Sequence, residues 1–282
     1  MSKIMEKYRL TDDTIEFEGR TLYRIEALKD FDTVKAGDLG GFIENTNNLE
    51  QSGTSWVFNN AKVFGNALVR DDAKVFDNAK IFDNAALFDN AQVLNDAQVF
   101  GKAVLNDNVR VLGNAKIFGN TSLEDNVLVQ GNVEVYEHAW VNGNVKIYDN
   151  AKIFGSALVQ GYVKIYGNVQ IFEYASISDK VVLCGNVKAH NYVRLLGCAE
   201  FKGDAELQSE KDYIVFKNWW SSGRYFTWTR SNNMWKVGCF YGTGEELIKK
   251  AYNDSKESGR EYERVVRYVE SILNDTYENK ED

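Results

Sequence analysis

The chain repeats a six-residue pattern from Ala61 to Ala205 without a slip in register. Each repeat, or hexad, begins with Ala, Val or Thr and carries an aliphatic residue two positions later, interrupted only by Ala189 and Phe201. Residues 78–91, NAKIFDNAALFDNA, give the pattern in its plainest form. Buried residues two positions apart predict a short strand with one buried face, whereas a helix would need a period of about 3.6 residues.

The last two positions of each hexad carry residue types that favour tight turns. Gly, Asn and Asp accept the left-handed backbone geometry that a sharp corner needs. One series begins with Gly65, Asp71, Asp77, Asp83 and Asp89, and the next begins with Asn66, Asp72, Asn78, Asn84 and Asn90. Each hexad therefore predicts a strand and a corner. The chain contains no proline, which suits stacked strands because proline would remove a backbone donor from the ladder.

These hexads, such as NAKIFG at residues 114–119, resemble the hexapeptide-repeat family of left-handed parallel β-helices. The resemblance implies a mainly β, triangular prism with three hexads per coil, and it covers residues 55–207. About eight coils would then form a prism roughly 40 Å long at about 4.8 Å between strands. Proteins of this family are commonly trimers, so the resemblance also implies a homotrimer. Here the residue after the aliphatic is often Phe or Tyr, which departs from the family pattern.

With three hexads per coil, residues eighteen positions apart lie on the same face of the prism. Grouping the residues in this way predicts three faces of different composition. On the first face, the residue after the aliphatic forms an aromatic series: Phe64, Phe82, Phe100, Phe118, Tyr136, Phe154, Phe172 and His190. One interpretation is that these rings stack and shield the corners of the prism. The alternative is that an apolar stripe pointing outward is a subunit interface.

On the third face, the residue before the aliphatic is small or apolar: Leu68, Ala86, Val104, Ser122, Trp140, Leu158 and Ser176. We expect this face to form the oligomer interface, with Leu68, Val104, Trp140 and Leu158 as its main contacts.

The segments on either side of the repeat predict separate structures. Residues 1–54 contain a hairpin over 14–28 with its turn at Glu18-Gly19, and we expect them to cap the first coil. Residues 208–282 predict a small α+β module: two or three antiparallel strands over 213–243, with turns at Ser222-Gly223 and Asn232-Asn233, then helices near 244–256 and 259–277. Thr243 and Glu246 have the spacing of a capping box.

The module carries the best binding candidates of the sequence: Arg224, Tyr225, Trp228, Arg230 and Trp235. Aromatic faces can stack on a base, and arginine binds phosphate or carboxylate through two parallel hydrogen bonds. Protein interfaces favour the same residue types. The alternative is that the tryptophans are simply the core of a small domain, since Trp is highly buried on average.

Composition narrows the remaining classes of function. The net charge is −8, which disfavours a nucleic-acid partner. Three scattered cysteines and two histidines predict no disulfide, no metal site and no cofactor. The start of the chain lacks an apolar signal core and no window could span a membrane, so we expect a soluble, cytoplasmic protein. Acyl transfer, the activity that many hexapeptide-repeat enzymes share, remains the alternative; we expect no catalytic residues.

Three segments also resemble C-terminal and N-terminal segments of β-helix proteins from phages and prophages. They are GCFYGTGEEL (238–247), TLYRIEALKDF (21–31) and AGDLGGFIE (36–44). This resemblance implies a phage-encoded protein acting in the host cytosol. Our hypothesis is a non-enzymatic binding protein that sequesters a host protein or a nucleotide-type signal and so blunts host defence. A purely structural, self-associating repeat protein is a further alternative.

Overall fold

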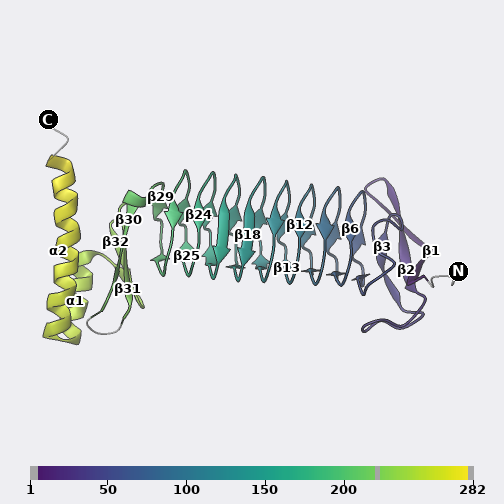
Figure 1. The fold of residues 1–282 in the computed structure, drawn as a ribbon, viewed down its shortest axis with the longest axis horizontal. Coiled ribbons are helices and arrows are strands. Elements are labelled where there is room, and N and C mark those ends of the chain that lie inside the picture. The colour runs from purple at the N-terminus through teal and green to yellow at the C-terminus, as the bar shows by residue number, and fades with distance from the viewer. Residues whose placement is uncertain (1–5, 220–222, 279–282) are drawn as a thin grey trace.

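The computed structural model of the protein describes residues 6–219 and 223–278. The molecule is an elongated rod: a parallel β-solenoid of about nine turns, with a hairpin at its N-terminal end and a small sheet with two helices at its C-terminal end (Figure 1). The mainly β fold built on a parallel β-helix, which the hexads predict, is therefore confirmed. There are more turns than the eight expected because residues before 55 also stack on the solenoid: β3 (Leu39–Ile43) pairs in parallel with β5 (Lys62–Val63), and Leu49 bridges to Val69.

The solenoid strands form three parallel sheets. The first sheet also includes the hairpin and runs in the order β1 (Tyr8–Phe17), β2 (Arg20–Ala27), β3, β5, β8 (Lys80–Ile81), β11 (Gln98–Val99), β14 (Lys116–Ile117), β17 (Glu134–Val135), β20 (Lys152–Ile153), β23 (Gln170–Ile171), β26 (Lys188–Ala189) and β29 (Glu206–Leu207).

The second sheet runs in the order β4 (Trp56–Val57), β7 (Lys74–Val75), β10 (Gln92–Val93), β13 (Arg110–Gly113), β16 (Leu128–Gly131), β19 (Lys146–Ile147), β22 (Lys164–Gly167), β25 (Val182–Gly185) and β28 (Glu200–Phe201). The third sheet contains β6 (Leu68–Val69), β9 (Ala86–Leu87), β12 (Val104–Leu105), β15 (Ser122–Leu123), β18 (Trp140–Gly143), β21 (Leu158–Gly161), β24 (Ser176–Ile177) and β27 (Arg194–Leu195). From β4 onward, each residue of a solenoid strand pairs with the residue eighteen positions later, as Val104 does with Ser122. Three hexads therefore make one turn.

The small and aliphatic positions of the hexads fill the interior. Residues such as Ala79 and Ile81 are fully buried and belong to one continuous apolar cluster that runs the length of the solenoid. Thr121 takes the place of an alanine or valine there, and its Oγ1 is the one buried side-chain N or O atom without a hydrogen-bond partner among the described residues. Over the described turns, the interior of the solenoid is therefore a packed apolar core.

The corners are held by ladders of hydrogen bonds between successive turns. The carboxylate of Asp149 accepts from the backbone N–H of Gly167 at 2.8 Å. Among the described residues, nine more carboxylates and the amide oxygen of Asn95 each accept from the backbone N–H eighteen residues later. At the corner that contains Asp149 and Gly167, side-chain amides also donate to one another at 2.9–3.0 Å through Asn114, Asn132, Asn150, Asn168 and Asn186. Asp149 has a φ of 62°, the left-handed geometry that the turn residues predicted.

The aromatic series of the first face forms a stacked ladder. From Phe64 to His190, successive ring centroids lie 4.6–5.1 Å apart, with planes within 5° of parallel. Phe64 is buried and the other rings are half-buried. This geometry agrees with the interpretation that the rings pack on one another and shield the surface of the first sheet.

The N-terminal hairpin closes one end of the first sheet. Strands β1 and β2 turn at Glu18 and Gly19, both at positive φ, as expected. Lys7 is fully buried beneath the hairpin, and its Nζ donates to the carbonyl of Ser55 at 2.9 Å and to that of Ser52 at 3.0 Å. The hairpin therefore covers an edge that would otherwise expose unpaired backbone groups.

The C-terminal module follows a short 3-10 helix, η1 (Glu210–Asp212). Its antiparallel sheet has four strands rather than two or three: β30 (Tyr213–Lys217), β31 (Tyr225–Thr229), β32 (Met234–Val237) and β33 (Phe240–Gly242). The fourth strand was missed because it is three residues long. The turn at Asn233 is present, with a φ of 51°, whereas Ser222 of the other expected turn lies outside the described residues.

Two helices cover this sheet, α1 (Gly244–Asp254) and α2 (Lys256–Glu278) (Figure 1). The expected capping box is present: the Thr243 backbone N–H donates to Glu246 Oε2 at 2.9 Å, and Thr243 Oγ1 accepts from the Glu246 N–H. Val266 and Val269 pack into the apolar core of the module. Within the described part of the chain, no helix combines the length and apolarity needed to cross a membrane.

Candidate functional site

The module is fixed to the last turn of the solenoid by its polar side chains. The Oγ1 of Thr227 accepts from the backbone N–H of Glu200 at 3.2 Å, and the Oγ of Ser231 accepts from that of Glu206 at 2.7 Å. Glu200 and Glu206 begin the last strands of the second and first sheets. Hydroxyl groups of the module therefore accept from backbone N–H groups that would otherwise have no partner at the end of the solenoid.

Two tyrosines strengthen the same junction. The hydroxyl of Tyr213 donates to the carbonyl of Arg194 at 2.7 Å, and the hydroxyl of Tyr241 donates to that of Lys202 at 3.1 Å. The ring of Tyr213 also meets Phe201 edge-on at 5.2 Å, at the end of the solenoid core. Hydrogen bonds and ring packing therefore hold the module against the solenoid, and the side chains that line the pockets between them are held in place.

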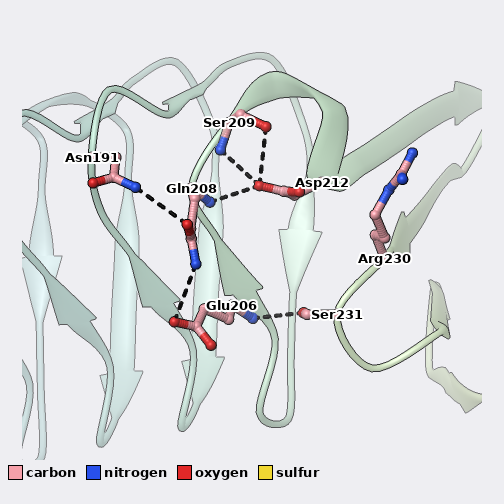
Figure 2. Close-up of a pocket in the computed structure, with 7 residues that line it drawn as sticks. All are labelled: Asn191, Glu206, Gln208, Ser209, Asp212, Arg230 and Ser231. Atoms are coloured by element: carbon pink, nitrogen blue, oxygen red, sulfur yellow. Dashed lines mark hydrogen bonds between the residues drawn. The ribbon is translucent and has the colours of Figure 1, made fainter. Parts of the chain in front are cut away.

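The larger of two junction pockets, which we call the Arg230 pocket, has a volume of about 420 Å³ (Figure 2). Its lining residues are Asn191, Glu206, Gln208, Ser209, Asp212, Arg230 and Ser231. The Asp212 carboxylate accepts hydrogen bonds from the backbone N–H groups of Gln208 and Ser209, at 2.8 and 2.7 Å. The Arg230 Nε donates to the carbonyl of Lys211 at 3.1 Å. The exposed Arg230 therefore supplies the positive charge of this lining, against the carboxylates of Glu206 and Asp212.

The second pocket, the Arg224 pocket, measures about 200 Å³ and is lined by Cys198, Glu200, Arg224, Tyr225, Thr227, Lys236 and Gly238. The buried ammonium of Lys236 lies 3.1 Å from a carboxylate oxygen of Glu200. A hydrogen bond between Tyr225 and Cys198 raises the pKa of the Tyr225 hydroxyl. Because Glu200 pairs with Lys236, the exposed guanidinium of Arg224 supplies the remaining positive charge of this pocket.

The structure divides the five residues that the sequence singled out in the module. Arg224 and Tyr225 line one pocket and Arg230 lines the other. Trp228 and Trp235 are each 2% exposed and belong to the apolar core of the module, which agrees with the core alternative. Trp228 also donates from Nε1 to Asn233 Oδ1 at 2.9 Å. Neither indole face is available to stack on a ligand.

The four residues expected at an oligomer interface share one surface. Leu68, Val104, Trp140 and Leu158 all lie on the third sheet at equivalent positions of their strands. Trp140 is 46% exposed, which is high for the largest apolar side chain. The sequence therefore placed these side chains on one face correctly.

Three exposed apolar residues near the junction were missed by the sequence reasoning. Tyr174 and Tyr192 are 58% and 75% exposed, and their rings stack at 5.0 Å. Leu196 is 44% exposed. Tyr192 directly follows Asn191 of the Arg230 pocket, and Leu196 lies two residues before Cys198 of the Arg224 pocket. For Tyr174 and Tyr192 the available signal was a tyrosine at a corner position that usually holds Asn or Asp.

The two histidines occupy different environments. His138 is exposed at a corner. His190 ends the aromatic ladder, 4.6 Å from Phe172, and its Nε2 lies 3.1 Å from Glu206 Oε1. Among the described residues, no group of three or more His, Cys, Asp or Glu side chains is placed to hold a metal ion.

Comparison of the chain with models of known protein families found no match, and comparison with characterised proteins found none either.

Proposed function

We propose that the chain is a non-enzymatic binding protein that captures a protein partner at the C-terminal end of its solenoid. The observation that carries this proposal is the exposed stacked pair Tyr174–Tyr192, in which Tyr192 directly follows Asn191 of the Arg230 pocket. Tyrosine and arginine dominate the energetic centres of protein interfaces, because both combine large contact area with hydrogen bonding. Here they occur together, with Arg224 and Arg230 in pockets whose walls are fixed by the docked module.

A protein partner fits this end better than a nucleotide-type signal. The two buried tryptophans cannot stack on a base. Two carboxylates, Glu206 and Asp212, line the larger pocket beside one arginine, so a polyphosphate would be repelled there. A single acidic side chain of a partner protein would pair with the exposed Arg224 of the smaller pocket, where Glu200 is already paired with Lys236, while the tyrosines contribute apolar contact.

Acyl transfer has less support. From β4 to β29 the hexads follow one another without an inserted loop, and the interior is packed with apolar side chains. The resemblance to hexapeptide-repeat proteins supports a left-handed coil. The resemblance of three segments to phage and prophage proteins supports a phage-encoded protein that acts against host defence in the host cytosol.

Affinity capture with the immobilised chain tests the proposal. The Tyr174→Ser/Tyr192→Ser variant should retain at least tenfold less of any partner that the unmodified chain retains. Leu39→Ser is the matched control, because Leu39 is 60% exposed at the opposite end of the rod. Equal capture by the tyrosine variant would move the site elsewhere. A nucleotide released from the native protein by heat, with no protein retained, would replace protein capture by sequestration of a small molecule.

A further inference from the structure

The third sheet presents a face that is poor in charge. Two rows of side chains point outward from it. We call the residues before each buried aliphatic the outer row, which reads Leu68, Ala86, Val104, Ser122, Trp140 and Leu158 along six successive strands. The companion row lies two residues further on and reads Arg70, Phe88, Asn106, Glu124, Asn142 and Gln160. Two charged residues in these twelve positions contrast with a chain that is 26% charged.

The first sheet provides the comparison. Its residues at the equivalent outer positions include Lys62, Lys80, Lys116, Glu134 and Lys152. Depletion of charge at the centre of a patch, together with an exposed tryptophan, is the compositional mark of a protein interface. The outer positions of the second sheet also carry charges, at Lys74, Arg110, Lys146 and Lys164. The third sheet is therefore the face of the solenoid best suited to be covered.

We propose that a second copy of this chain covers the third sheet, with the two solenoids antiparallel. A two-fold axis that lies in the interface, parallel to the strands, reverses the order of the strands and sets each row against itself. When the axis passes between β12 and β15, Trp140 of one copy lies opposite Ala86 of the other, Leu68 lies opposite Leu158, and Val104 opposite Ser122. This inference is independent of the proposed partner site.

The residues match under this symmetry. Ala86 is the smallest residue of the outer row and only 8% exposed, so it leaves a recess where the large Trp140 side chain arrives. In the companion row, Glu124 meets Asn106, whose amide can donate to the carboxylate, and Arg70 meets Gln160. No like charges oppose each other in either row. A two-fold interface requires this kind of self-complementary patch.

Other arrangements of the same face match less well. Parallel solenoids would set the outer row against the companion row, so that Leu68 meets Arg70 and Trp140 meets Asn142. An antiparallel pair centred on β15 would bring the two Glu124 carboxylates face to face. A pair centred between β15 and β18 would oppose Leu68 to Arg194.

The area is sufficient for a specific dimer. Six strands at about 4.8 Å, each with six residues of strand and corner at about 3.3 Å, give a footprint of about 570 Å² on each copy. The two copies together then bury about 1,100 Å², above the roughly 1,000 Å² that a specific interface with good complementarity needs. On the same face, Leu49 continues the stack beyond β6 through its bridge to Val69, so the chain near Glu50 of one copy lies opposite Ser176 of the other. The antiparallel arrangement places the two C-terminal modules at opposite ends of the dimer.

Mass measurement in solution tests the dimer, against a monomer of 32.1 kDa. The unmodified chain should have twice this mass at tens of micromolar. Trp140→Ala empties the recess and Ala86→Trp sets two indoles against each other, so each should weaken dimerisation at least tenfold. The swapped variant Ala86→Trp/Trp140→Ala should restore it. A monomeric or trimeric unmodified chain, or a swap that fails while remaining folded by circular dichroism, would overturn the proposal.

Cross-linking tests the register. Cys198 and Cys239 are first replaced by serine, and the buried Cys184 is kept. Ala86→Cys/Trp140→Cys should form a covalent dimer under mild oxidation. The two positions are three turns apart within one copy, about 14 Å, so they cannot link to each other. Val104→Cys/Leu158→Cys and Ala86→Cys/Leu158→Cys report the two shifted registers. A covalent dimer from either of these, and none from the first pair, would overturn the proposed contact.

Discussion

The Oγ of Ser231 in the C-terminal module accepts a 2.7 Å hydrogen bond from the backbone N–H of Glu206, in the last strand of the first sheet. Thr227 makes the equivalent contact with the N–H of Glu200 in the second sheet, at 3.2 Å. An unpaired strand edge invites pairing with other chains, and these two hydroxyls block it without adding a strand. The module therefore has a structural role in addition to any partner that it contacts.

The two hydroxyls should differ in how much they stabilise the fold. Thr227 is 1% exposed, so Thr227→Val should leave the Glu200 N–H without a partner and cost about 1–3 kcal/mol. The Glu206 contact is exposed, so water can replace Ser231 and Ser231→Ala should cost less than about 1 kcal/mol. Urea denaturation of the two variants measures both values. A larger loss for Ser231→Ala would contradict this account of the edge.

The repeat could be predicted from sequence because one periodicity determines both burial and hydrogen bonding. Ala79 and Ile81 are buried for the same reason that Asp83 turns the chain, and the period of six recurs too often to be ambiguous. The aromatic ladder followed from the same count. The candidate site depends on how the module sits on the last turn, and no periodicity relates Arg224 to Glu200 or Arg230 to Glu206. Composition alone could not separate Trp228, in the core, from Tyr192, on the surface.

Thr121→Val should stabilise the protein. The Thr121 hydroxyl is buried without a hydrogen-bond partner, and valine has nearly the same shape without the polar atom. Removing an unsatisfied hydroxyl should raise the free energy of unfolding by about 1 kcal/mol. Thr121→Ser is the control, because it keeps the hydroxyl and loses a buried methyl group, and it should destabilise. Thermal or urea denaturation separates the two; a less stable valine variant would mean that the hydroxyl has a partner, such as a buried water.

Gly155→Ala and Gly197→Ala should separate the free-energy cost of a positive φ from the cost of a steric clash with the next turn. Both glycines have positive φ, 71° and 78°, so alanine should lose a similar conformational free energy of about 1–2 kcal/mol at each. At Gly155 the new Cβ would also lie 2.5 Å from the backbone nitrogen of Glu173, whereas at Gly197 nothing lies within 4 Å. Gly155→Ala should therefore be the more destabilising by urea denaturation. Equal losses would show that the turns can move apart without penalty.

Lys7 should make the stability of the fold depend on pH in an alkaline window. Burial lowers the pKa of Lys7 from 10.5 to about 8 in the folded protein. Between pH 8 and 10.5 the unfolded chain therefore binds more protons at this residue than the folded chain. The free energy of unfolding should rise with pH there, by at most about 1.4 kcal/mol per pH unit, and should not depend on this group below pH 8.

Lys7→Met isolates that contribution, because the variant lacks the titrating group and shares the other ionisable residues. Burial raises the pKa of the Tyr8 hydroxyl, which lowers stability above about pH 10, since the unfolded chain loses that proton first. Urea denaturation between pH 7 and 9.5 avoids this opposing effect. The stability of the unmodified protein minus that of Lys7→Met should be constant near pH 7 and rise above pH 8. A difference that stays level or falls up to pH 9.5 would mean that Lys7 keeps its proton when buried, held by the carbonyls of Ser52 and Ser55.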